Sequence, residues 1–301
     1  MNNILMIFID GVGIGRVDYS FNPFFKYGFK TFEKFLGGIP SLQNSKLEGN
    51  NCFLFPVDAC LGIEGLPQSG TGQTSIFCGV NAPKIIGQHF GPYPYSTLVP
   101  IIKEKNIFKH FLDKKQYVSF VNAYPKIFFD YINSGKKRLS ATTLMCQLNG
   151  MRLNKAADVW RGKALTAEIT NERWNQKLGY SLPIISPEKA AKRLLRISSQ
   201  NTFTLYEYFL TDHIGHGRYG DEFEQILNNL DRFLYGIFER MDYKNSTLVI
   251  CSDHGNLEDI SIKMHTLNPA LMIAAGKNAK AISQQVNDLT QIKDAVINLF
   301  K

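Results

Sequence analysis

The 301-residue sequence contains no apolar run of the roughly 18 residues that a membrane-spanning helix needs. Its first apolar stretch, residues 4–9, lacks a basic flank and ends at Asp10, so we expect no secretory signal there. Internal repeats, low-complexity tracts and Pro/Ser-rich linkers are also lacking. Hydrophobic residues make up 44% of the chain and charged residues 20%, a composition typical of a folded globular protein. We therefore expect a single domain over residues 1–301 and no membrane partner.

Cysteine is scarce, and its pattern excludes a disulfide framework or a C-x-x-C redox motif. The chain has five cysteines, an odd number. Scattered thiols in a chain of this length are typical of a reducing compartment, which predicts a cytoplasmic protein.

The charge balance is basic, with 34 Lys and Arg against 26 Asp and Glu, a formal net charge of +8. This excess favours anionic partners. The longest run of contiguous cations has only three residues, Lys136, Lys137 and Arg138, so the sequence does not indicate a nucleic-acid-binding stripe. Small molecules that carry phosphate fit the charge equally well, and the sequence leaves the oligomeric state open.

Strand-like and helix-like segments alternate along the chain. Five apolar runs have the length of strands buried on both faces: 4–10, 117–123, 202–212, 246–253 and 271–275. Residues 223–241 carry a wide apolar stripe at helical spacing, Ser186–Pro187 begins another helix, and 289–300 forms a closing amphipathic helix. Strands separated by helices predict an α/β fold, a three-layer sandwich with a mostly parallel central sheet.

Two stretches fit this alternation poorly. Residues 20–55 are rich in Phe and Gly, and we expect irregular loops there with one helix over 31–36. Residues 126–185 contain many polar and basic side chains and both tryptophans. A long excursion between sheet elements often covers an active site, so we expect 126–185 to be an insertion or lid.

Three of the predicted strands end in aspartate, at Asp10, Asp212 and Asp253. Because the carboxyl ends of parallel strands meet at one edge, we expect these carboxylates to converge. Histidines accompany them at His216, His254 and His265. Carboxylates and imidazoles suit Zn²⁺ or Mn²⁺, and six such groups exceed the needs of one tetrahedral site. The sequence therefore predicts two divalent metal ions, although any one of these residues alone reads equally well as a turn or core residue.

A stretch of small and hydroxyl residues, 65–79, reads as a strand–turn–helix junction. Small residues let the backbone approach a ligand closely, and a helix start attracts an anion. A hydroxyl held against a divalent metal there could attack phosphorus. Taken alone, Ser69 is more simply a helix cap. The stretch lacks Gly-Lys-Ser/Thr and so is not a Walker A loop.

Together these residues resemble the alkaline phosphatase superfamily, within it the metalloenzyme branch of cofactor-independent phosphoglycerate mutase and phosphopentomutase. Phe8-Ile-Asp10-Gly11 looks like the first motif of that branch, and Ser69-Gly-Thr-Gly-Gln73 is similar to the stretch that holds its nucleophile. The remaining motifs are similar to Asp212-x-x-x-His216, Asp253-His254-Gly255-Asn256 and His265-Thr-x-Asn-Pro269.

The resemblance implies a role for each matched residue. Asp212, His216 and His265 would hold one metal; Asp10, Asp253, His254 and the Ser69 oxygen would hold the other. Ser69, preferred to Thr71 or Thr74, would accept the phosphoryl group in line and pass it to water or to an organic hydroxyl. The two metals would stabilise the nucleophile and the developing charge.

The sequence departs from the branch in two ways. Gln73 stands where the mutase stretch has His, and the large second domain that shields the phosphoenzyme of the mutases is replaced by about 60 residues, 126–185. A smaller lid makes hydrolysis easier, which favours a phosphohydrolase over a mutase.

Candidate contacts for a small phosphorylated substrate are Thr71, Arg138, Arg161, Lys163, Arg173 and Arg218. A non-catalytic relative that keeps its metals for stability remains an alternative.

Overall fold

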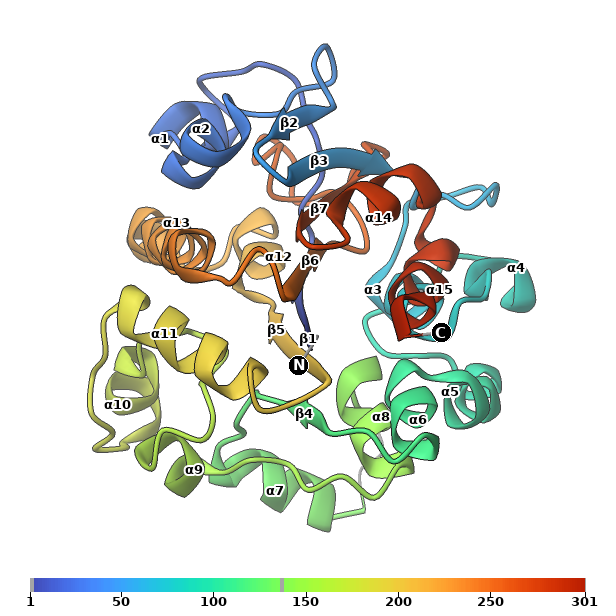
Figure 1. The fold of residues 1–301 in the computed structure, drawn as a ribbon, viewed down its shortest axis with the longest axis vertical. Helices are drawn as coiled ribbons and strands as arrows, with labels where there is room; N and C mark the ends of the chain where they lie inside the picture. The colour runs from blue at the N-terminus through green and yellow to red at the C-terminus, as the bar shows by residue number, and fades with distance from the viewer. Residues whose placement is uncertain (1–2, 136–137, 301) are drawn as a thin grey trace.

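The computed structural model describes residues 3–135 and 138–300. A single seven-stranded sheet lies between two layers of helices, with strand order β2-β3-β7-β6-β1-β5-β4 (Figure 1). The strands are β1 (Asn3–Ile9), β2 (Leu47–Gly49), β3 (Cys52–Val57), β4 (Val118–Phe120), β5 (Phe203–Tyr208), β6 (Ser246–Cys251) and β7 (Ala270–Gly276). The three-layer α/β sandwich predicted from the alternation of strands and helices is confirmed.

The helices cover both faces of this sheet. The α-helices are α1 (Pro23–Tyr27), α2 (Lys30–Leu36), α3 (Ser69–Cys78), α4 (Ala82–Ile86), α5 (Val99–Lys105), α6 (Ile107–Asp113), α7 (Lys126–Asn133), α8 (Ala141–Leu148), α9 (Ala156–Trp160), α10 (Glu172–Leu178), α11 (Pro187–Ser198), α12 (Leu210–Gly215), α13 (Phe223–Arg240), α14 (Ala279–Gln285) and α15 (Ile292–Ile297). Four 3-10 turns complete the set: η1 (Ser96–Leu98), η2 (Gly220–Glu222), η3 (Leu289–Gln291) and η4 (Asn298–Phe300).

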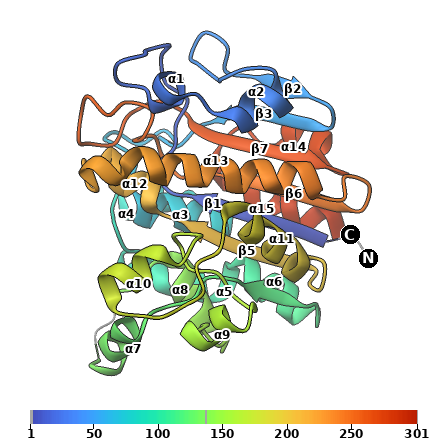
Figure 2. The same cartoon turned by 90° about the vertical axis from the view of Figure 1, so that its left-hand side faces the viewer.

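Strand β1 divides the apolar interior into two cores. Its side chains alternate, so that Leu5 and Ile7 belong to one buried cluster while Met6 and Phe8 belong to the other. The first cluster lies under α2, α11 and α13; the second lies under α3, α5, α6, α14 and α15 (Figure 2). Burial on both faces explains why β1 reads as a continuous apolar run.

The sheet is mixed, and most of its strands run in the same direction, as predicted. Strands β6, β1, β5 and β4 pair in parallel, but β7, β3 and β2 join the sheet through antiparallel pairings. Between β6 and β7 the chain runs through a loop without a crossover helix, and such a connection returns the chain antiparallel. Strands β2 and β3 were not predicted, because residues 20–55 were expected to form irregular loops around one helix.

The predicted helices agree well with the structure. Helix α2 matches the expected 31–36, and α13 matches 223–241. Helix α11 begins at Pro187, with the Ser186 hydroxyl accepting the Lys189 N–H as an N-cap. The closing segment 289–300 is helical but divided into η3, α15 and η4. No helix in residues 3–135 and 138–300 is long and apolar enough to cross a bilayer.

Residues 126–185 form α7, α8, α9 and α10 and lie around the β4 edge of the sheet (Figure 1). Helix α8 packs against the main core, contacting α3 and α5. Apolar side chains of the remainder divide between the two cores of the sheet and a small separate cluster around Trp174 and Val159. A lid role for this segment stays a prediction.

Candidate metal centre

The three acidic residues meet at one edge of the sheet. Asp10 directly follows β1, and Asp253 lies two residues beyond the end of β6. Asp212 was expected to end a strand, but β5 stops at Tyr208 and Asp212 lies in the first half of the short helix α12. The turn of α12 still directs this carboxylate to the same edge, where it meets Asp10 and His254.

The antiparallel strands bring the remaining residues to this edge. Because β7 runs opposite to β6, its first residues lie beside the carboxyl end of β6, and His265 precedes β7 by five residues. Val57 at the end of β3 pairs with Ala270 at the start of β7. The chain that leaves β3 therefore reaches Ser69 at the same edge.

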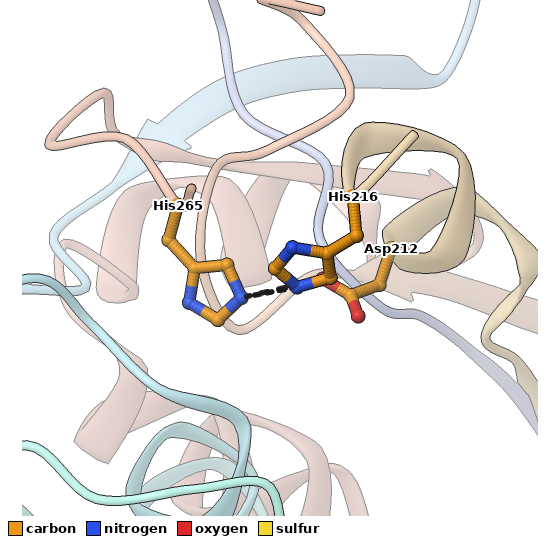
Figure 3. A group of neighbouring side chains, drawn as sticks. All are labelled: Asp212, His216 and His265. Carbon is orange, nitrogen blue, oxygen red and sulfur yellow. Dashed lines mark hydrogen bonds and ion pairs between the residues drawn. The ribbon is translucent and has the colours of Figure 1, made fainter. Parts of the chain in front are cut away.

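The first cluster consists of Asp212, His216 and His265 (Figure 3). The two imidazole Nε2 atoms are 3.2 Å apart, and each lies 3.4 Å from Asp212 Oδ1. Although burial opposes it, hydrogen bonding from His265 and the positive field of the neighbouring histidines hold the pKa of Asp212 below its ordinary value. The carboxylate is therefore ready to act as an anionic ligand.

Backbone carbonyls orient both imidazoles of this cluster. The Nδ1 atom of His265 lies 2.6 Å from the Pro67 carbonyl, and that of His216 lies 2.8 Å from the Lys263 carbonyl. A carbonyl can only accept, so each Nδ1 carries the proton and donates it. The Nε2 atoms are then the ring atoms directed at each other and at Asp212, and once deprotonated they would hold a cation between them.

The second cluster consists of Asp10, Asp253, His254 and Ser69. The His254 Nε2 atom lies 3.4 Å from Asp10 Oδ1, 3.5 Å from Asp253 Oδ2 and 3.0 Å from the Ser69 Oγ. Burial, followed by repulsion from Asp253 and Asp212, raises the pKa of Asp10 well above its ordinary value. Carboxylates packed this closely in the interior need a compensating cation to stay ionised.

Ser69 occupies the first position of α3, yet its side chain does not cap that helix. Its hydroxyl faces His254, and the N-cap residue Gln68 makes no side-chain capping bond. Gly72, one turn further along α3, packs so closely on Asp253 that a Cβ there would lie 2.9 Å from the Asp253 Cβ. Glycine at this position lets the helix start approach the acidic edge.

The donor set fits a pair of divalent cations. The buried atoms Asp10 Oδ1 and Asp253 Oδ2 have no hydrogen-bond partner among the described residues. Such orphaned carboxylate oxygens are costly unless they bind a proton or a cation. Two groups of three side chains have ligand atoms close enough together to bind one ion each, and Asp212 belongs to both. Oxygen and imidazole ligands of this kind suit Mn²⁺ or Zn²⁺.

Two residues that support the clusters were not singled out from the sequence. The Asn256 amide donates to Asp212 Oδ1 at 2.8 Å. The buried Glu258 carboxylate accepts the N–H groups of Gly13 and Asn256 and the Thr266 hydroxyl. Glu258 thus ties together the three loops that carry Asp10, the Asp253–His254 pair and His265. Their place in the run Asp253-His-Gly-Asn-Leu-Glu258 is the sequence signal that could have drawn attention to them.

A cavity of about 1040 Å³ opens over both clusters, with Asp10, Ser69 and His265 among its lining residues. Glu207, at the end of β5, also lines it, and burial raises the pKa of this carboxyl to about 7. Of the expected substrate contacts, Arg218 and Arg138 line the cavity.

The other expected contacts lie outside this lining. Thr71 is fully buried in α3, where its hydroxyl donates to the Gln68 carbonyl. The Arg173 guanidinium pairs with Glu222 and stacks on Tyr219. Arg161 follows α9 and Lys163 lies close behind it, and neither is among the cavity residues. Substrate binding by Arg218, Thr71 and Arg161 stays a prediction.

Comparison with known families decides the relationship. The sequence pattern of the metalloenzyme superfamily matches residues 2–301. The chain belongs to this superfamily. No curated protein sequence matches it significantly.

Solved structures confirm the fold. An alkaline phosphatase from the Antarctic bacterium TAB5 superposes with a TM-score of 0.56 at 12% identity, covering 99% of this chain and 97% of that one. A cold-active alkaline phosphatase from Shewanella gives 0.51 at 12% identity, covering 98% and 99%. The predicted membership of the alkaline phosphatase superfamily is thereby confirmed. Membership of this superfamily implies divalent-metal binding, for which the two clusters provide candidate ligands.

Proposed function

We propose that this chain is a cytoplasmic two-metal phosphohydrolase that acts on small phosphorylated metabolites through a phosphoserine at Ser69. One observation carries the proposal. The Ser69 hydroxyl leaves its own helix uncapped and lies 3.0 Å from His254 Nε2, on the floor of an open cavity. A serine placed only to cap this helix would accept a backbone N–H of its first turn.

The residues divide the chemistry between them. Asp212, His216 and His265 would hold one cation, and Asp10, Asp253, His254 and the Ser69 oxygen the other. When bound, the two ions lower the pKa of a hydroxyl and neutralise charge on a transferring phosphoryl group. Ser69 attacks phosphorus, the leaving alcohol departs on the opposite side, and water later releases phosphate from Ser69. Asn256 keeps Asp212 turned toward the cluster throughout.

The cavity supports hydrolysis over transfer to a second hydroxyl. Its volume of about 1040 Å³ far exceeds that of a phosphoryl group, so water has access to a phosphorylated Ser69. A mutase must exclude bulk water so that an organic hydroxyl takes the phosphoryl group instead.

A screen of phosphorylated metabolites with Mn²⁺ or Zn²⁺, scored for both free phosphate and isomerised product, tests the proposal. We expect free phosphate without isomer. Isomer without free phosphate would establish the mutase alternative, and no turnover of any ester would favour a non-catalytic relative.

Substitution of the nucleophile tests the covalent step. Substrate labelled at phosphorus should label the protein on Ser69, and Ser69→Ala should abolish labelling and lower kcat by more than about a thousandfold. Ser75→Ala, in the same helix but bonded to the Thr71 carbonyl, is the matched control and should keep the label. Equal labelling of Ser69→Ala would exclude this nucleophile.

A further inference from the structure

We infer that the organic part of the substrate contains a planar ring system, such as a nucleobase, which stacks on an aromatic wall beside the metal centre. This inference concerns the substrate class and rests on the proposed function. Six aromatic side chains line the cavity that has Ser69 at its floor: Tyr93, Tyr124, Phe128, Tyr131, Trp174 and Phe209.

Helix α7 contributes Ile127, Phe128 and Tyr131 to this wall. Its Phe128, Phe129 and Ile132 side chains are partly buried against the apolar core under α3, but Ile127, which lines the cavity, is 67% exposed. Exposed apolar surface of this kind is costly to leave in water and marks a ligand site. Because α7 and Ser69 border the same cavity, the group that covers α7 is continuous with the reacting phosphate.

Rings already stack within this wall. The centroids of the Tyr124 and Phe128 rings lie 4.2 Å apart, with an interplanar angle of 25°. Such a pair offers a flat face to a further ring. Trp174 of α10 also lines the cavity, although most of this residue is buried. A planar ring fits between flat aromatic faces better than a flexible chain, because it loses little conformational entropy on stacking.

The polar side chains of the wall are poorly suited to a sugar alone. Asn122 is occupied on both sides by the Glu207 backbone, and the Thr143 hydroxyl bonds Tyr124 and Ser140. A binding site for several sugar hydroxyls needs uncommitted hydrogen-bonding groups.

The charged rim favours an anionic ligand over a neutral one. Arg138, Arg218 and Lys263 line the cavity and are exposed, and none of them forms an ion pair with a carboxylate within residues 3–135 and 138–300. Three uncompensated cations attract a phosphate ester into the cavity.

The test compares three esters on the protein loaded with Mn²⁺: AMP, ribose 5-phosphate and decyl phosphate. AMP and ribose 5-phosphate share the same phosphoryl ester and differ in the base. We expect kcat/KM for AMP to exceed that for ribose 5-phosphate by roughly 10- to 100-fold, the preference that stacking of one base on aromatic side chains gives. Equal values for the two, or a higher value for decyl phosphate, would overturn the inference while leaving the phosphohydrolase intact.

Binding separates this inference from the proposed activity. Calorimetry on Mn²⁺-loaded Ser69→Ala should show AMP binding at least about tenfold more tightly than ribose 5-phosphate. If this preference appears without turnover of either ester by the wild type, the ring site stands and the proposed activity fails. Equal binding of the two ligands would exclude the ring site even if both are hydrolysed.

Two neighbouring phenylalanines of α7 provide a matched pair of variants. Phe128→Ala should lower the AMP to ribose 5-phosphate ratio by about tenfold. Phe129→Ala should leave the ratio unchanged, because Phe129 lies outside the cavity lining and packs beside Lys155. Equal effects of the two variants on this ratio would contradict stacking of the ring on Phe128.

Discussion

At the scale of single residues, the centre depends on histidines whose proton positions are fixed by the backbone. His216 and His265 each donate from Nδ1 to a carbonyl, which leaves Nε2 as the ring atom directed at Asp212. This control of the tautomer costs no additional side chain, since the acceptors belong to Lys263 and Pro67.

His216→Ala should lower the metal content from two ions per chain to one. Its side chain is 30% exposed, so its removal leaves only a small cavity and the fold should persist. Elemental analysis after dialysis against a metal buffer measures the change. His213→Ala is the matched control, because that neighbouring imidazole bonds the Tyr219 hydroxyl and lies outside both clusters. Two tightly bound ions in His216→Ala would contradict its assignment as a ligand.

Glu258→Gln should weaken metal binding although Glu258 belongs to neither cluster. An amide has only one acceptor oxygen, whereas both oxygens of Glu258 accept hydrogen bonds, so at least one buried hydrogen bond is lost. The three loops that carry the metal ligands are then held together less firmly. We expect about 2–4 kcal/mol less stability and a metal affinity lower by tenfold or more. Thermal melts and metal titrations measure both quantities.

The half-exposed Glu188, which pairs with Arg232 on the surface, supplies the control for this change. Glu188→Gln should alter stability by less than about 1 kcal/mol. Metal affinity in Glu258→Gln equal to that of the wild type would show that Glu258 has no positioning role.

At the scale of secondary-structure elements, buried carboxylates join helices that are far apart in sequence. Helix α2 begins after Phe29, which cannot cap it with its side chain. Asp231 of α13 supplies the missing acceptor, taking the N–H groups of Lys30 and Thr31 at 2.9 Å each. A carboxylate at a helix start also interacts favourably with the helix dipole.

Asp231→Ala should destabilise the protein by about 2–3 kcal/mol, since it leaves two backbone donors of α2 without their acceptor. Denaturant unfolding gives the free energy directly. Glu224→Ala, an exposed change in the same helix, should stay within about 0.5 kcal/mol of the wild type. If the two variants are equally stable, Asp231 does not cap α2.

At the scale of the whole molecule, we expect metal binding at this centre to stabilise the folded protein. Three carboxylates, of Asp10, Asp212 and Asp253, lie close together at this edge of the sheet. The raised pKa of Asp10 reflects the free-energy cost of ionising this carboxyl without a cation. Any ligand that binds only the folded state stabilises it by mass action. The segments that form the centre come from both ends of the chain, so bound cations would link distant parts of the sequence at this sheet edge.

Mn²⁺ or Zn²⁺ at about a hundred times its dissociation constant should stabilise the fold by about 2.7 kcal/mol, raising Tm by several degrees. Excess chelator should reverse the shift. His216→Ala, which lacks one ligand, should show a smaller increase. A wild-type Tm that does not respond to either metal would contradict the assignment of these residues as a metal centre.

Much of the fold was predictable because it follows from the spacing of apolar residues along the sequence. Burial on both faces of β1 gives an uninterrupted apolar run, and the stripe of α13 has the helical period. The residues of both clusters were chosen from their motifs, and the structure brings all of them together. Strands β2 and β3 were missed because β2 has only three residues and β3 contains Pro56, which is atypical of strand interiors.

The sequence by itself determined the chemistry available to this protein: a hydroxyl, three carboxylates and three imidazoles in motifs of fixed spacing. Local patterns also predicted that Asp10 and Asp253 would follow strands, but not that Asp212 would lie in the helix α12. Only the tertiary structure decided the reversal of β7, the tie made by Glu258 and the aromatic wall that joins α7 to α10. Each of these arises from contacts between distant segments, whose geometry is set when the two cores pack against the sheet.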